Sequence, residues 1–469
     1  MRVVGCGPGI ALELDQPLDG SGDRLVGQVH IGTLLAGPAA TVHDVSTVNV
    51  GILGCGNVGG GLIGLISEQH DVVLARTGAD LRVARVAVRS ISKSRDVDVD
   101  SNLLTVDAAA VVNDPGIDVV VETIGGIEPA RELILAALAA GKPVVTANKE
   151  LLANHGAELY AAAAAAGVDL LFEAAVAGAI PLMRPLRESL IGEPITRVMG
   201  IVNGTTNYIL TQMTEAGASY HDALAEAQSL GYAERDPTAD VEGFDAGAKA
   251  AIIASVAFGV SVVAGDVYHE GISAITEADI AFASRLGYAV KLLAIAELVD
   301  KTEVAVRVHP AMVPLTHPLA SVRDSFNAVF VEGGAVGDLM FYGRGAGGRP
   351  SASAVFGDLI DAATNIQRGG ASLGELPRAS IRSIDDIESA FYLSLDVADQ
   401  AGVLATVAAV FGAHGVSIRS MEQEGLGGDA RLIFITHPAR EANVQRTLAD
   451  LAQLDVVARV GSTLRVIGE

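Results

Sequence analysis

The chain has 469 residues, is half hydrophobic and carries a formal net charge of −24. Its length allows about two to four domains. So acidic a chain lacks the basic face that nucleic acids and anionic membranes require, which excludes both as expected partners. Cys6 and Cys55 are its only cysteines, too few for a disulfide framework or a cysteine-based zinc site.

No segment resembles a targeting or membrane sequence. The N-terminal apolar run is short and is interrupted by Glu13 and Asp15, unlike a signal peptide. The longest uncharged apolar run, residues 250–265, is shorter than the roughly 18 residues that a membrane-spanning helix needs. We therefore expect a cytoplasmic protein, with residues 250–265 in a buried helix.

Residues 1–46 show no hydrophobic period and contain several Gly, Pro and Asp residues, so we expect a poorly ordered N-terminal extension. In residues 47–175, strand-like runs alternate with helix-like spacing. The expected strands are 48–53, 81–88, 119–121 and 143–146, and a helix is expected at 131–140. This alternation predicts an α/β domain with a parallel, doubly wound sheet.

Residues 176–345 mix helices and strands without regular alternation, which indicates a second, α+β domain. We expect this domain to bind substrate and to form the dimer contact. A glycine-rich break at 343–348 follows, and residues 346–380 are expected to form a helix that returns to the first domain, and then a linker. The expected helices are 220–230, 245–263, 277–298 and 350–363, and the expected strands are 198–202, 304–308 and 328–331.

Residues 389–469 form a third unit with its own pattern. The expected order is strand 391–397, helix 402–411, strands 416–423 and 431–436, helix 440–451 and strand 456–466. This βαββαβ order predicts a ferredoxin-like fold.

Gly54, Gly56 and Gly59 form a G-x-G-x-x-G pattern between an expected strand and helix-like spacing. The first glycine allows a tight turn, the second lets the backbone approach a pyrophosphate, and the third lets the helix pack on the sheet. The N-terminus of that helix would hold the phosphates. In this context the pattern predicts a Rossmann-type NAD(P)-binding domain over residues 47–175.

Arg89 follows the second expected strand, where an acidic residue would favour the free ribose hydroxyl of NAD. With Lys93 and Arg95 nearby, an arginine suits the 2′-phosphate of NADP instead. We expect NADP as the preferred cofactor, while a plain surface arginine and the use of both cofactors remain open.

Lys149 follows another expected strand, in the sequence Thr146-Ala147-Asn148-Lys149. Ligands of open α/β sheets bind outside the carboxyl ends of the strands. Because lysine is scarce in this chain, we interpret Lys149 as a candidate site residue, with an ordinary surface lysine as the alternative.

Residues 231–249 combine several acids with Lys249 and lead into the apolar run. Asp245 and Lys249 are four residues apart and share a face if the segment is helical. Glu234 precedes a turn at Asp236-Pro237 and therefore belongs to a loop.

This segment fits the chemistry of alcohol oxidation. A dehydrogenase needs a group that takes the hydroxyl proton as the hydride leaves, and a buried lysine serves if its pKa falls. Neighbouring carboxylates would hold Lys249 in place and bind a substrate ammonium, although they also oppose that fall. A solvated ion pair on a helix surface is the alternative.

Residues 173–181 are apolar apart from Glu173. Irregular backbone there could offer carbonyl oxygens to a hard cation beside the Glu173 carboxylate. A tight crossing between domains would explain the same residues.

Together these residues resemble homoserine dehydrogenase, in the long form with a C-terminal ACT domain. The resemblance implies reversible oxidation of L-homoserine to L-aspartate 4-semialdehyde with NAD(P), in the biosynthesis of threonine, isoleucine and methionine. It covers about residues 47–469 and rests on segments 54–59, 122–126, 146–149, 173–181, 203–208, 231–249 and 345–354.

Position by position, the resemblance implies roles for single residues. Lys249 resembles the proton donor and acceptor, and Lys149 the residue between nicotinamide and substrate, while we expect Asp240 to orient Lys249 or a water. Glu234 and Asp245 resemble the ligands of the homoserine ammonium. With the glycine motif included, cofactor contacts fall on Gly54, Gly56, Asn57, Val58, Gly59, Arg89, Thr123, Lys149, Gly231 and Gly347. The sodium site of the family falls on Glu173, Val176, Gly178 and Ile180, three of them through backbone carbonyls.

Residues 396–404 resemble an ACT domain, a module that binds small amino acids, often across a dimer interface. Gly402, at the start of an expected helix, fits recognition of an amino acid by a helix N-terminus. The resemblance implies feedback regulation by threonine and a homodimer or homotetramer. A plain dimerisation module would explain the same residues.

Two other functions fit part of the pattern. A non-catalytic sensor of nucleotide and amino acid would have no use for Glu234, Asp245 and Lys249 together. A different ACT-linked dehydrogenase, such as a 2-hydroxy-acid enzyme, would need a histidine–carboxylate pair and an arginine. We find no such arrangement around the ten histidines.

Overall fold

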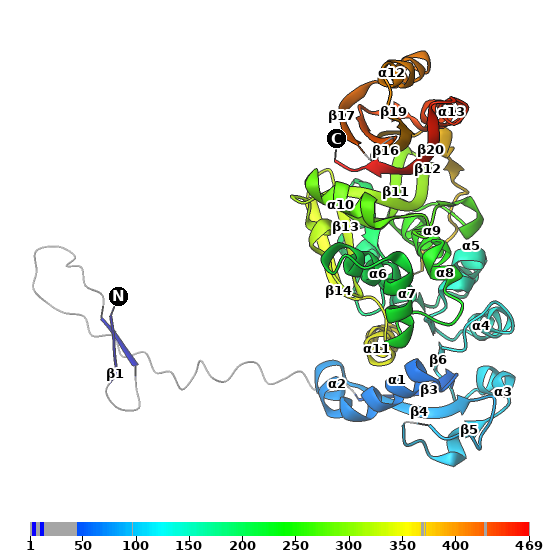
Figure 1. The fold of residues 1–469 in the computed structure, drawn as a ribbon. Coiled ribbons are helices and arrows are strands. Elements are labelled where there is room, and N and C mark those ends of the chain that lie inside the picture. Colours follow the sequence, from blue (N-terminus) through cyan, green and yellow to red (C-terminus); the bar gives the residue numbers. More distant parts are fainter. Residues whose placement is uncertain are drawn as a thin grey trace, which may run out of the picture.

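The computed structural model describes residues 2–5, 10–13, 45–95, 97–366, 370, 372–425 and 429–468. Within the expected N-terminal extension, strands β1 (Arg2–Gly5) and β2 (Ile10–Glu13) pair antiparallel. The expectation of poor order for the rest of residues 1–44 lies outside the described residues. From β3 onward the chain forms three successive parts, coloured blue to cyan, green to yellow and orange to red (Figure 1).

The first part is a parallel sheet with helices on its faces, as predicted. The strand order is β5-β4-β3-β6-β7-β8. From β3 the chain adds β4 and β5 on one side and β6, β7 and β8 on the other, and this switch between the parallel strands β3 and β6 opens a crevice at their carboxyl ends. Its strands are β3 (Ser46–Leu53), β4 (Ala79–Ala87), β5 (Leu104–Thr105), β6 (Val119–Glu122), β7 (Val144–Thr146) and β8 (Leu170–Leu171). Its helices are α1 (Asn57–Glu68), α2 (His70–Thr77), α3 (Ala108–Asn113), α4 (Ala130–Ala139) and α5 (Lys149–Ala166).

Helix α11 (Gly348–Asn365) returns from the second part and packs on the first. Val355 and Leu359 of α11 are fully buried among the apolar side chains of β3 and α1. The two helices approach closely, because a Cβ on Gly61 of α1 would lie 3.0 Å from that of Ala352. The two parts therefore meet directly beside the glycine motif.

The second part is a largely antiparallel sheet covered by helices. The strand order is β14-β13-β9-β11-β12, and two short strands, β10 and β15, join β12 in parallel. The strands are β9 (Ile195–Ile201), β10 (Tyr268–His269), β11 (Tyr288–Asp300), β12 (Glu303–Pro314), β13 (Phe326–Gly333), β14 (Gly337–Arg344) and β15 (Ser380–Ile381). The helices are α6 (Gly204–Glu215), α7 (Tyr220–Ser229), α8 (Thr238–Val241), α9 (Phe244–Phe258) and α10 (Glu277–Arg285).

Two expected helices of this part were wrong in extent. The helix expected at 277–298 ends at Arg285, and Gly287, with a φ of +83°, turns the chain into strand β11. The apolar run of β11 is buried in the middle of the sheet, where a continuous apolar pattern cannot distinguish a strand from a helix. The helix expected at 245–263 ends at Phe258, because Gly259 takes the left-handed conformation.

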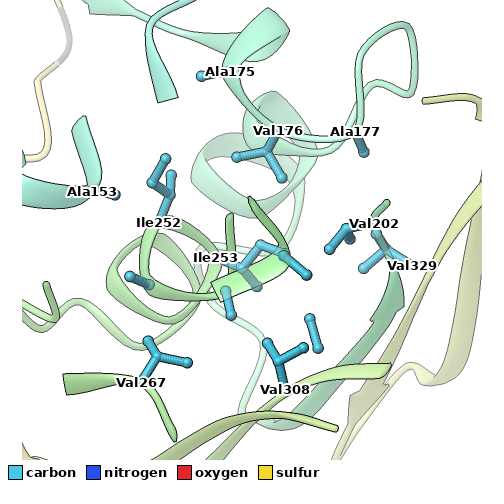
Figure 2. Close-up of a cluster of buried hydrophobic side chains, with 14 of the residues drawn as sticks. Ala153, Ala175, Val176, Ala177, Val202, Ile252, Ile253, Val267, Val308 and Val329 are labelled. Atoms are coloured by element: carbon cyan, nitrogen blue, oxygen red, sulfur yellow. The ribbon is translucent and has the colours of Figure 1, made fainter. Parts of the chain in front are cut away.

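Helix α9 lies in the middle of the largest apolar core. Ile252 and Ile253 of α9 lie among Val176, Val202 and further apolar residues from the sheet and from the loop after β8 (Figure 2). Since α9 also carries Asp245 and Lys249, this core fixes both side chains relative to the sheet.

The third part has the βαββαβ order predicted from the sequence, with strand order β20-β16-β18-β17. Strand β20 also pairs in parallel with β12, at Ala311 with Arg465 and Met312 with Val466, so the second and third parts share one continuous sheet. In the described part of the chain, no helix has the length and apolar character of a membrane span. The elements are β16 (Glu388–Ala398), α12 (Val403–Ala413), β17 (Ile418–Gly425), β18 (Asp429–Thr436), β19 (Ala439–Arg440), α13 (Glu441–Leu451) and β20 (Val457–Val466).

Candidate active site

A cleft of 1210 Å³ lies outside the carboxyl ends of β3, β4 and β6. Thr123, just after β6, is tied to the end of β3 by a backbone hydrogen bond from its N–H to the carbonyl of Leu53, at 2.8 Å. The cleft therefore occupies the crevice where the strand order reverses. Five predicted cofactor residues line it: Gly54, Gly56, Asn57, Arg89 and Thr123.

The three motif glycines have different structural reasons to be glycine. Gly54 has a φ of +101°, which only glycine adopts without strain. A Cβ on Gly59 would lie 2.2 Å from the carbonyl oxygen of Gly54, so the close packing of α1 on the turn requires glycine. A Cβ on Gly56 would meet no described atom within 4 Å. The fold alone does not demand glycine at position 56, which leaves the approach of a pyrophosphate as its reason.

The loop after β4 supplies positive charge to one end of the cleft. Arg89, Lys93 and Arg95 all line the cleft there. The guanidinium of Arg95 donates to the backbone carbonyls of Ser90, at 2.5 Å, and Lys93, at 2.8 Å, and thereby closes the loop on itself. Arg95 therefore shapes the loop, whereas Arg89 is the residue that follows the strand directly.

The other predicted cofactor residues lie at or outside the rim of this cleft. Val58 and Gly59 belong to the first turn of α1, and Gly347, with a φ of +133°, precedes α11, whose Gly348 lines the cleft. Gly231 is exposed after α7. Lys149 lies in a second group of residues, described next.

Lys149, Asp245 and Lys249 form a lysine–aspartate cluster where the first and second parts meet. Lys149 is the first residue of α5, and its ammonium lies against Oδ1 of Asp245. Lys249 donates to Oδ2 of Asp245 at 2.7 Å and to the backbone carbonyl of Val202 at 2.6 Å. The Asp245 side chain is only 5% exposed. One buried carboxylate therefore holds two ammonium groups.

The cluster sets the charges of its members. Burial alone would raise the pKa of Asp245, but the two lysines outweigh it and hold that pKa far below its usual range. Burial alone would lower the pKa of Lys149, but Asp245 raises it overall. Lys149 is therefore an ammonium, and Asp245 a carboxylate, at neutral pH.

Asn203 connects this cluster to Asp240, a role that sequence reasoning did not give it. Its Nδ2 donates to Oδ2 of Asp245 at 2.8 Å and to Oδ1 of Asp240 at 2.7 Å, while its Oδ1 caps α6. Asp240 thus reaches Lys249 through Asn203 and Asp245. Mainly because it is desolvated by burial, the pKa of Asp240 is raised. The sequence signal was present, since Asn203 opens the segment 203–208 used in the resemblance.

Glu122 is a second residue that the sequence analysis left without a role. It is fully buried at the end of β6, and its carboxylate accepts from the hydroxyl of Thr146 at 2.6 Å. It also accepts from the backbone N–H groups of Ile124 and Gly125, at 2.7 and 2.9 Å. Glu122 therefore joins the turn beside the cleft to the strand that leads to Lys149. The sequence signal was an acid at the end of a buried apolar run, and Glu122 opens the segment 122–126 used in the resemblance.

The structure does not bring Glu234 into the cluster by any contact within the described residues. Glu234 is exposed in the loop between α7 and α8, where its backbone carbonyl accepts from the side chain of Gln228 at 3.0 Å. Asp245 and Glu234, the two expected ammonium ligands, therefore differ sharply in burial.

The expected cation residues lie on the loop after β8. Both oxygens of the Glu173 carboxylate accept backbone N–H groups, from Met183 at 2.7 Å and Arg184 at 2.8 Å among others. The backbone N–H of Glu173 donates to Asp358, whose pKa burial raises to about 7. Gly178 has a φ of +58°, and a Cβ there would lie 2.2 Å from the carbonyl oxygen of Gly345.

This loop is thus packed tightly against Gly345, in the segment between β14 and α11. Among the described residues, no group of three or more His, Cys, Asp or Glu side chains could hold a metal ion. Any cation on this loop would therefore be held mainly by backbone carbonyls.

Comparison with known proteins agrees with this geometry. Family models match the NAD-binding domain of homoserine dehydrogenase at residues 54–173, homoserine dehydrogenase at 181–360 and the ACT domain at 391–456. Homoserine dehydrogenase from Corynebacterium glutamicum is 52% identical over 90% of this chain and 96% of the relative.

Solved structures agree as well. A homoserine dehydrogenase from Thiobacillus denitrificans superposes with a TM-score of 0.84 at 41% identity, over 90% of this chain and 98% of that one. A hyperthermophilic archaeal homoserine dehydrogenase in complex with NADPH, at 30% identity, has a TM-score of 0.57 over 68% of this chain and 98% of that one.

The domain that contains the glycine motif is accordingly one that binds a nicotinamide cofactor. The matches span the chain from the glycine motif to the C-terminal unit and cover nearly the whole of each relative. It follows that this chain belongs to the homoserine dehydrogenases, oxidoreductases that act on the CH–OH group of homoserine, and that it carries their C-terminal ACT domain.

Proposed function

We propose that Lys249 and Lys149 carry the proton chemistry of the reaction between L-homoserine and L-aspartate 4-semialdehyde. The observation that supports this most is the single buried carboxylate of Asp245, which both ammonium groups contact. Asp245 supplies the negative charge that lets the two lysine side chains lie close together at one place.

When bound, the nicotinamide supplies the hydride for reduction of the aldehyde or accepts it from the alcohol. In the oxidation Lys249 acts as a neutral amine that takes the hydroxyl proton, and in the reduction it acts as an ammonium that returns a proton to the same oxygen. Two of its three donor positions are used by Asp245 and Val202, which leaves one for the substrate oxygen. Lys149, held as an ammonium by Asp245, donates a further hydrogen bond and stabilises negative charge on that oxygen.

We assign the substrate ammonium to Glu234 and Asp245, with Asp240 as the residue that orients the cluster through Asn203. Oδ2 of Asp245 accepts two hydrogen bonds and Oδ1 faces Lys149, so a carboxylate with four acceptor positions keeps one for the substrate. Glu234 is exposed and free to reach a bound amino acid from the loop before α8.

We propose NADP as the preferred cofactor. Arg89, Lys93 and Arg95 gather at one end of the cleft, where a 2′-phosphate would gain charge-assisted hydrogen bonds. Arg89→Ala should shift the ratio of kcat/KM for NADP over NAD toward NAD by about tenfold or more, the effect of losing one such bond. Steady-state rates with each cofactor measure this ratio, and an unchanged ratio would remove Arg89 from the phosphate site.

We propose that a monovalent cation, sodium above all, binds at the loop of residues 173–180. Backbone carbonyls of Val176, Gly178 and Ile180 would supply most of its ligands, beside Glu173. Such a cation would support the crossing between the domains. Activity and melting temperature in sodium against a bulky organic cation would test this assignment.

We propose threonine as the effector bound by the ACT domain, and a homodimer or homotetramer in the cytoplasm as the working form. Gly402, with a φ of +93°, leads into α12 and offers backbone N–H groups to a small amino acid. The test is NADPH oxidation with aspartate semialdehyde, with and without threonine. Loss of rate with threonine supports the assignment, and an unchanged rate counts against it.

A further inference from the structure

A buried ion-pair group joins the ACT domain to the catalytic domain. Arg465 of β20 is 2% exposed and donates from Nε and Nη2 to the two carboxylate oxygens of Glu441, at 2.9 and 2.8 Å. From Nη1 and Nη2 it donates to the two oxygens of Glu270, at 3.0 and 2.9 Å. One guanidinium therefore binds two carboxylates, each through two hydrogen bonds.

The carboxylates of Glu441 and Glu270 belong to different domains. Glu441 is buried at the first residue of α13, where the helix N-terminus favours negative charge, and it also accepts from Gln445 at 2.8 Å. Phe391 of β16 lies 5.8 Å from the guanidinium. Arg465 is thus held within the ACT domain by Glu441, whereas Glu270, which is 32% exposed, belongs to the catalytic domain.

Glu270 begins a segment that touches the active site. The next residues are pinned to the end of α8, because Ile272 donates its N–H to the carbonyl of Val241 at 2.8 Å. A Cβ on Gly271 would lie 2.3 Å from that same oxygen, so the two backbones are in close contact. A shift of Glu270 would therefore displace Val241, the neighbour of Asp240.

The same segment also touches the start of α9. The ring of His269, just before Glu270, lies 4.3 Å from that of Phe244, the first residue of α9. A Cβ on Gly243 would lie 3.2 Å from the carbonyl oxygen of Glu270. Residues 269–272 thus contact both helices that carry acids of the site, Asp240 on α8 and Asp245 on α9. Closely packed groups of this kind pass on a displacement.

We propose that Glu270 is a positioning residue for homoserine binding, and that Arg465 sets its place according to the state of the ACT domain. Residues 269–272 then form the link between the effector domain and the acids of the active site. The effector part of this proposal rests on the regulation proposed above, while the positioning part does not.

Glu270→Gln in the full chain tests the link, because it keeps the shape of the side chain and removes its charge. Glu303→Gln is the matched control. Glu303 is 31% exposed and is held by Arg382 through two hydrogen bonds of 3.0 and 2.8 Å, at the opposite end of β12 from β20. Both variants should keep the melting temperature close to that of the parent protein.

Without effector, we expect Glu270→Gln to raise the KM for homoserine by about fivefold or more, the lower limit for coupling between sites. The KM for NADP should not change, and neither should any constant of Glu303→Gln. Arg465→Lys keeps the positive charge but cannot donate two parallel hydrogen bonds to each carboxylate, and it should raise the homoserine KM in the same way. A homoserine KM in Glu270→Gln equal to that of the control would overturn the proposal.

Threonine titrations of the same proteins separate the two proposals. If threonine inhibits the parent protein, Glu270→Gln should need at least about fivefold more threonine for the same inhibition. An unchanged threonine response in that variant would overturn the link to the ACT domain. If threonine does not inhibit the parent protein, the effector assignment fails, and the homoserine KM alone decides the positioning role.

Discussion

Asp245 shares its two oxygens among three donors, with Lys149 on one and Lys249 and Asn203 on the other. The sequence spacing predicted the contact of Asp245 with Lys249, since residues four apart meet on one face of a helix. It did not predict the contacts with Lys149 and Asn203, which come from α5 and from the residue before α6. Contacts between distant segments depend on packing, which no local pattern encodes.

Asn203 offers a test of how the acids are ordered. Asn203→Asp keeps the acceptor that caps α6 but replaces the donor between Asp240 and Asp245 with a third negative charge. We expect kcat/KM for homoserine at neutral pH to fall by about tenfold to a hundredfold, the cost of losing hydrogen bonds to charged groups. Because the introduced carboxyl can donate once protonated, part of this loss should be recovered as the pH falls.

The control is Asn154→Asp, because Asn154 is exposed on α5 and bonds only to the backbone of its own helix, at Glu150, in the described contacts. Its kcat/KM should follow that of the parent protein at every pH. If Asn203→Asp and the control have the same pH profile, Asn203 has no part in ordering the site.

At the scale of elements, the turn between β3 and α1 was predicted, because Gly54 and Gly59 each meet a steric demand of the fold and Gly56 leaves room for a pyrophosphate. The strand β11 was not, because its buried apolar run has no alternating pattern. The end of α9 was also missed, since the apolar run continues past Gly259 while the helix does not. Turns can thus be predicted from local residue types. A segment buried on both faces has a continuous apolar sequence, from which a helix and a strand cannot be distinguished.

The glycine turn gives a prediction of its own. Gly56→Ala should leave the melting temperature nearly unchanged, since its Cβ would meet no described atom within 4 Å, yet it should raise the KM for the cofactor about tenfold or more by crowding the pyrophosphate. Gly59→Ala should instead destabilise the fold by roughly 1–3 kcal/mol, because its Cβ would lie 2.2 Å from the Gly54 oxygen. Thermal melts and cofactor kinetics separate the two effects. Equal loss of stability in both variants would contradict this division.

At the scale of the whole molecule, two packing contacts among those described help to join the three parts. Helix α11 ties the second part to the first beside the cofactor cleft, and β20 pairs with β12 so that the ACT domain continues the catalytic sheet. The sequence predicted the fold of each unit but not the pairing of β20 with β12. That pairing involves only two residue pairs and leaves no periodic signal.

In the reaction proposed above, two parts of the molecule have separate tasks. The first part binds the nicotinamide cofactor, and the lysine–aspartate cluster between the parts is proposed to transfer the proton. Lys249 stands on α9 in the second part and is not one of the residues that line the cofactor cleft. Removal of its ammonium should therefore stop the chemistry and leave the cofactor bound.

The most direct measurement is the turnover of Lys249→Ala in NADPH oxidation with aspartate semialdehyde, together with the dissociation constant for NADPH. Lys301→Ala, at an exposed lysine between β11 and β12, is the control. We predict that kcat of Lys249→Ala falls by at least about a hundredfold, the lower range for loss of a general acid, with NADPH binding unchanged. Turnover close to that of the control would contradict the assignment of the proton chemistry to this cluster.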